Sequence, residues 1–188
     1  METIVKKVNF VSALIFGISL LVFSHFSFAK NLNQADIQNF INTMQAINST
    51  DNTAIKAIKD KNTINTKTNL PIDDEGNLSI YRQAILQDIE PESKNALEEL
   101  VKDNGFDSLL DWATISDKVM AAYFNFKLGK EGGAEIPELT PEMRESMPPE
   151  MLNMIEQATK MLNSVKNTPQ EDVSLVEKNY TEIESVMQ

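Results

Sequence analysis

The stretch that decides the fold runs from Ser108 to Leu128 and reads SLLDWATISDKVMAAYFNFKL. Ser108 is a favoured helix N-cap residue, and Asp111 stands three residues later, where a capping box places its reciprocal partner. The apolar residues of the stretch are Leu109, Trp112, Ile115, Val119, Met120, Tyr123, Phe124, Phe126 and Leu128. They fall on more than one side of a helix, which is typical of the buried centre of a bundle. We therefore predict a central helix over 108–128. Core packing of its aromatic rings is favoured over a ligand pocket lined by Trp112 and Tyr123.

Apolar residues at helical spacing predict further helices on both sides of this stretch. No segment alternates with the period of two that is typical of strands. The predicted helices cover about 34–47, 78–89, 91–103, 141–147, 149–165 and 169–187. A polar connection over 49–77 and a flexible, Gly-containing loop over 129–140 separate them. We expect an all-α fold, a compact bundle of about six helices in one domain over 30–188.

Two short motifs mark helix boundaries. Asn104-Gly105-Phe106 predicts a helix stop, with Gly105 in the left-handed conformation and Phe106 folding back on the preceding turn. Thr168-Pro169-Gln170-Glu171 matches a full capping box with Pro at the first helical position, and it should start the last helix.

The N-terminal segment 1–29 has the order of a secretory signal peptide. Lys6 and Lys7 form a basic head, an apolar run follows from Phe10 to Phe23, and Ser27-Phe28-Ala29 provides small residues at the exit. The apolar stretch is also long enough for an uncleaved membrane anchor, which takes about 20 apolar residues. We favour cleavage after Ala29, and hence a periplasmic or secreted protein that has no membrane contact once mature.

Cleavage would also remove the only histidine, His25, and the chain contains no cysteine. The mature chain would then have no His general base, Cys nucleophile, disulfide or Cys/His zinc site. We therefore name no catalytic residue, cofactor or metal site.

Acidic residues dominate the chain, which carries 28 Asp and Glu against 17 Lys and Arg, a net charge of −11. Such a charge opposes binding to nucleic acid or to anionic lipid. It is compatible with a cationic partner, but solubility is the simpler explanation.

Five methionines cluster in the segment that follows the loop: Met143, Met147, Met151, Met154 and Met161. Their spacing would line one helical face, which Pro148-Pro149 divides between two helices. Packing into the core is the favoured interpretation, because Met fills irregular gaps. The alternatives are an adaptable groove for a partner or apolar ligand, and a Cu(I) site made of thioethers.

Acidic residues offer two weaker candidate sites. The turn Asp73-Asp74-Glu75-Gly76-Asn77 resembles a calcium loop only loosely, because Pro71 and Arg82 would occupy positions that need oxygen ligands. Carboxylate pairs such as Asp107 with Asp111 and Glu138 with Glu142 could in principle serve acid–base chemistry, although an acidic helical surface carries such pairs by default.

These patterns favour an exported, non-enzymatic interaction or chaperone-like protein of the cell envelope, whose partner is a protein or a small apolar ligand. One alternative is a carrier of a small apolar ligand or Cu(I), with an enclosed pocket between the Trp112 helix and the methionines. The other is a carboxylate-based hydrolase, which needs two acids facing each other across a cleft. The binding residues expected from the sequence are Met143, Met147, Met151, Met154, Met161, Trp112 and Tyr123.

Overall fold

A computed structural model describes residues 31–56, 71–86, 89–133, 136 and 139–187. The expected signal peptide 1–29 and residues 57–70 of the polar connection 49–77 lie outside these residues. The chain divides into one unit from Met1 to Asn31 and a second from Leu32 to Gln188, and the architecture below is that of the second unit.

The fold is all-helical, as the sequence predicts. The described residues contain eight helices with defined bounds and a further helical turn at 53–56, more than the six expected, and no strand beyond a single antiparallel bridge between Ile72 and Leu78. The bounds are α2 Gln34–Ser49, α4 Ile80–Leu86, α5 Pro91–Asp103, α6 Leu109–Lys130, α7 Pro141–Ser146, α8 Pro149–Lys166, α9 Gln170–Lys178 and α10 Tyr180–Met187. Among the described residues, no helix is long and apolar enough to cross a membrane.

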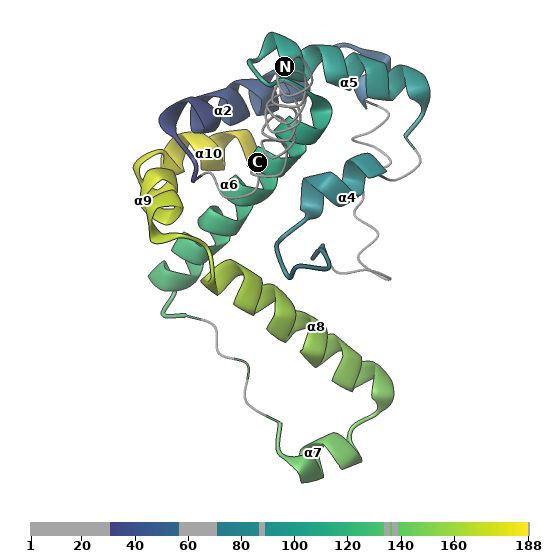
Figure 1. Ribbon diagram of the computed structural model, residues 1–188, viewed down its shortest axis with the longest axis vertical. Coiled ribbons are helices and arrows are strands. Elements are labelled where there is room, and N and C mark those ends of the chain that lie inside the picture. Colours follow the sequence, from purple (N-terminus) through teal and green to yellow (C-terminus); the bar gives the residue numbers. More distant parts are fainter. Residues whose placement is uncertain (1–30, 57–70, 87–88, 134–135, 137–138, 188) are drawn as a thin grey trace, which may run out of the picture. The chain divides into compact units, whose positions relative to one another are not determined.

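Helix α6 is the centre of the bundle, which confirms the prediction from 108–128. It contacts α2, α4, α5, α8 and α9, and Figure 1 shows it running between α2 and α9 on one side and α4 on the other. The Ser108 hydroxyl accepts a hydrogen bond from the Asp111 backbone N–H at 3.1 Å. The Asp111 carboxylate does not complete the predicted capping box. It accepts from the N–H of Asp107 instead, one residue earlier.

Two apolar clusters meet along α6. The larger joins α2, α6, α9 and α10 around Phe40, Val119, Val176 and Ile183. The smaller joins α5 to the start of α6 around Trp112. Met44, Tyr81 and Ile115 pack against both clusters, so the core is continuous through these side chains.

The predicted stop after α5 is confirmed. Gly105 has φ 93°, and the N–H groups of Gly105 and Phe106 bond back to the carbonyls of Lys102 and Val101. Phe106 is buried beside Val101. A Cβ at Gly105 would lie 2.8 Å from the side-chain nitrogen of Asn39 in α2, so glycine is required here by backbone conformation and by space.

The prediction for the last helix is wrong in two respects. The N-cap of α9 is Pro169, not Thr168, and it makes no side-chain cap bond. Within the described residues, the buried Thr168 hydroxyl has no hydrogen-bond partner. The helix is also divided at Asn179, whose side chain bonds both the Leu175 carbonyl and Gln34 of α2.

Candidate functional site

Three of the five exposed large hydrophobic residues among the described residues lie on an arm formed by α7 and α8. Thr140 caps α7 through its hydroxyl, and Pro141 occupies the first helical position. Pro148 lies outside α8 and Pro149 opens it, because proline is tolerated in a first helical turn but not in a helix interior.

The arm is anchored to the bundle at one end. Val165, one residue before the end of α8, is the only buried residue of the two helices. Its carbonyl accepts a hydrogen bond of 2.8 Å from the Asn125 side chain of α6. The rest of α8 therefore gains little stability from tertiary packing.

A shallow groove follows the N-terminal half of α8. Its apolar lining comes from Ile136, Pro148, Met151, Met154, Ile155 and Ala158, and Glu150 lies at its edge. The four α8 residues from Met151 to Ala158 are spaced by three or four positions, so they share one helical face. The groove has a volume of about 580 Å³ and is open to the surface rather than enclosed.

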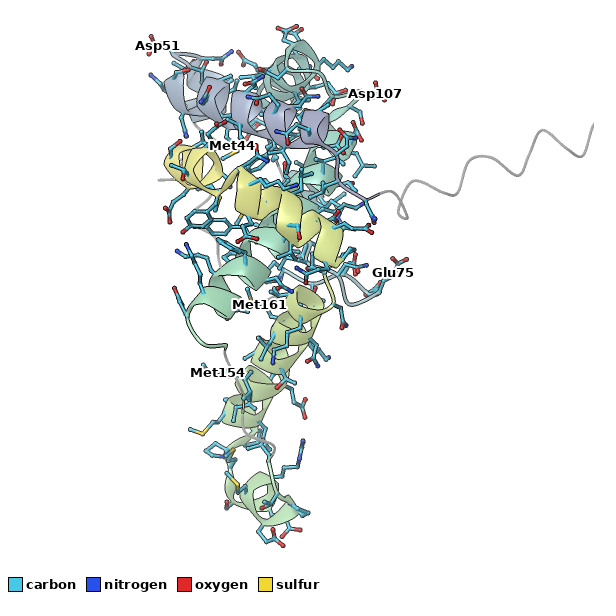
Figure 2. The ribbon with its side chains drawn as sticks, turned by 90° about the vertical axis from the view of Figure 1, so that its left-hand side faces the viewer. Met44, Asp51, Glu75, Asp107, Met154 and Met161 are labelled. Carbon is cyan, nitrogen blue, oxygen red and sulfur yellow. The ribbon has the colours of Figure 1, made fainter. Side chains whose placement is uncertain are left out.

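The expectation that the methionines pack into the core is wrong for three of the five. Met154 is 70% exposed, Met151 49% and Met143 41%, whereas Met147 and Met161 are half-buried. Figure 2 labels Met154 and Met161 at successive points along α8. A contiguous apolar surface of this kind is typical of an interaction site.

Trp112 and Tyr123 lie elsewhere and do not join the methionines. Trp112 is buried in the smaller cluster and Tyr123 in the larger one, which confirms the core interpretation of both rings. Within the described residues, the Trp112 indole N–H has no hydrogen-bond partner. No residue of α6 lines the groove on α8, so this groove is not the enclosed pocket expected for a carrier.

Acidic residues outnumber basic ones in the part of the sequence that contains the groove residues. Residues 131–158 contain seven Glu and a single basic residue, Arg144. Arg144 reaches from α7 to Glu156 of α8 at 3.5 Å. Glu142, in the first turn of α7, accepts hydrogen bonds from its own backbone N–H and from Thr140, which lower the pKa of its carboxyl. Glu150 lies at the edge of the groove, and Glu142 and Glu145 are exposed on α7, which directly precedes it in the chain; we refer to these three residues as the acidic rim.

A buried carboxylate that the sequence analysis missed fixes α4 to α6. Asp117 is 2% exposed and accepts hydrogen bonds from the backbone N–H of Tyr81 at 2.7 Å and from Arg82 Nε at 2.8 Å. Burial raises the pKa of Asp117 above its ordinary value, against the opposing effect of these partners. The sequence gives little indication that Asp117 pairs with Arg82, because 35 positions separate the two residues in the chain.

The acidic turn 73–77 belongs to the same network. Arg82 bonds Asp73 at 2.9 Å, and the Asp73 carboxylate also accepts from the N–H groups of Glu75 and Asn77. Although burial opposes it, these bonds lower the pKa of the Asp73 carboxyl. Among the described residues, no group of three or more acids and histidines could hold a metal ion. The turn therefore serves as a structural anchor for α4.

A second polar cluster lies at the other end of α6. The hydroxyls of Tyr180 and Tyr123 both donate to Glu184, at 2.5 and 3.5 Å, and the two rings stack with centroids 5.6 Å apart. The hydrogen bond to Glu184 raises the pKa of Tyr180. Lys130 lies 5.0 Å above the Tyr180 ring, so a cation–π contact completes the attachment of α10 to α6.

The pair Asp107 and Asp111 does not form a catalytic arrangement. Asp107 and Asp111 are joined through a backbone N–H at the start of α6, and Glu138 lies outside the described residues. A second groove, between the start of α2 and α9, contains Glu171 as its only carboxylate, and the groove on α8 contains only Glu150. Neither groove sets two acids against each other.

Comparison of the chain with protein-family models, with curated proteins and with solved structures finds no match in any of the three.

Proposed function

We propose that this protein is an exported, non-enzymatic interaction protein of the cell envelope that holds an apolar segment of another protein against the α7–α8 arm. The observation that carries the proposal is the exposed face of Met151 and Met154 along an open groove. Unbranched thioether side chains adjust to partners of different shape, and they are often used on surfaces that bind several partners.

The shape of the groove favours a protein segment over a small ligand. Sites for small molecules usually enclose most of the ligand surface. This groove is open along α8, so an extended or helical segment could lie in it without being surrounded. The isolated carboxylates and the lack of imidazole and thiol from Lys30 onward support a role in binding rather than catalysis.

Export rests on the leader pattern of residues 1–29. We expect the protein recovered from the periplasm or the medium to begin at Lys30, which intact-mass measurement would show. A protein that retains residues 1–29 and stays in the membrane fraction would support the anchored alternative.

Site-specific photocrosslinking tests the proposed binding surface. A photoreactive phenylalanine analogue would replace Met154 in the full chain produced in cells, and the matched control would carry it at Leu110, an exposed apolar residue of α6 (57%). We expect adducts with one or a few envelope proteins from position 154 and none from position 110. Equal adducts from both positions, or none from either, would refute the assignment.

Native mass spectrometry separates this proposal from the carrier alternative. We expect the purified protein to have its bare mass. A stoichiometric apolar adduct or one bound copper ion, lost when Met151 and Met154 are replaced by Ser, would favour the carrier.

A further inference from the structure

The groove on α8 combines an apolar floor with an acidic rim, and these two features together specify the chemistry of its occupant. The floor is the Met151–Ala158 face, which covers about two helical turns, or roughly 10 Å at 1.5 Å per residue. A facing helix would need apolar residues over a similar length to cover it.

The rim carries uncompensated charge. Arg144 is paired with Glu156, while Glu142, Glu145 and Glu150 are exposed and form no ion pair with another described residue. A neutral partner would desolvate these carboxylates without pairing with them. An acidic partner would be repelled by them. Lys or Arg residues flanking the apolar face of a partner would instead pair with them.

We propose that the α7–α8 arm binds a basic amphipathic helix, with apolar residues over two to three turns and Lys or Arg beside them. The inference rests on the proposed function and names the class of partner for the same surface. A second copy of the arm is a poor occupant, because it would bring the exposed Glu142, Glu145 and Glu150 of one copy against those of the other.

Three matched peptides test the charge preference. Each would have 18 residues and the same Leu positions on one helical face, with Lys, Gln or Glu at the polar positions. Fluorescence anisotropy would give their affinities for the full-length protein at low and high salt. We expect the Lys peptide to bind at least about tenfold more tightly than the Gln peptide at low salt, the Glu peptide to bind weakest, and added salt to reduce the difference.

Variants of the protein assign this preference to the arm. The triple change Glu142→Gln, Glu145→Gln and Glu150→Gln should lower the affinity for the Lys peptide to that for the Gln peptide. The matched control is Glu92→Gln, Glu99→Gln and Glu177→Gln, which removes the same charge from exposed positions on α5 and α9. The control should keep most of the preference.

The outcomes separate this inference from the proposed function. Equal binding of the Lys and Gln peptides, lost on replacing Met151 and Met154 by Ser, would overturn the basic partner and leave the apolar surface intact. Binding that neither the arm glutamates nor the arm methionines affect, or the absence of binding by any peptide, would overturn both.

Discussion

The bundle around α6 and the α7–α8 arm are built from similar residues that meet different environments. Phe40, Val119 and Ile183 of the bundle are fully buried, and its carboxylate Asp117 has three hydrogen-bond donors around it. The arm instead exposes Met151 and Met154, and its acids face solvent. In the part of the chain that the structure describes, the two apolar clusters of the bundle contain no residue of α7 or α8, so the arm adds little to the core. We therefore attribute the exposed methionine face of the arm to the binding of a partner and not to stabilisation of the fold.

The largest expected effect is in the bundle. Replacing Phe40 by Ala should reduce the free energy of unfolding by about 3–5 kcal/mol, because it removes a fully buried ring and leaves a cavity between α2 and α6. Urea denaturation followed by circular dichroism measures the loss. A change below about 1 kcal/mol would contradict the assignment of this cluster as the core.

The buried ion pair should come next. Asp117→Ala leaves Arg82 Nε and the N–H of Tyr81 without their acceptor, and we expect a loss of about 3 kcal/mol. Asp73→Ala, which removes the more exposed partner of Arg82, should cost about 1 kcal/mol. Equal losses in the two variants would show that Asp117 does not hold α4 as described.

Alkaline pH should weaken the bundle through Tyr81. Burial, assisted by the charge of Asp117, raises the pKa of Tyr81 to about 12 from its ordinary 10.0. Between these values the folded protein keeps a proton that the unfolded chain has lost, so stability falls as pH rises, by about 1.4 kcal/mol per pH unit. Urea denaturation on either side of pH 10 should show a smaller decline for Tyr81→Phe than for the unchanged protein. Identical declines would argue against a buried hydroxyl.

The smallest expected effect on stability is in the arm. Met154→Ser should change the free energy of unfolding by no more than about 0.5 kcal/mol, because the side chain is largely exposed. The same denaturation assay measures it, with Leu110→Ser as the exposed control. A loss above about 2 kcal/mol would mean that the methionine face supports the fold.

Local patterns predicted much of the fold. The Ser108 cap and the Asn104-Gly105-Phe106 stop depend on residues within one helical turn, and the structure has both. The Thr168 prediction failed because the first helical hydrogen bond, from the Val173 N–H, is accepted by the carbonyl of Pro169 and not by that of Thr168. The motif alone does not show whether the N-cap of the helix is Thr168 or Pro169.

Features that depend on contacts between residues far apart in the sequence could not be predicted from local patterns. Asp117 lies between Ser116 and Lys118 and reads as part of a polar helix face, although it is buried against α4. The methionine spacing correctly placed Met151 and Met154 on one helical face. Periodicity could not show whether another part of the chain covers that face, which depends on where α8 leaves the bundle.

Hydrogen–deuterium exchange with and without the Lys peptide tests the central claim, that the arm is a binding surface attached to a self-sufficient bundle. In the free protein, α2 and α6 should exchange slowly, while α7 and the first half of α8 should exchange rapidly because few buried contacts hold them. The peptide should slow exchange in residues 141–158 and leave α2 and α6 unchanged. Slow exchange of the free arm, or protection by the peptide confined to the bundle, would contradict the account.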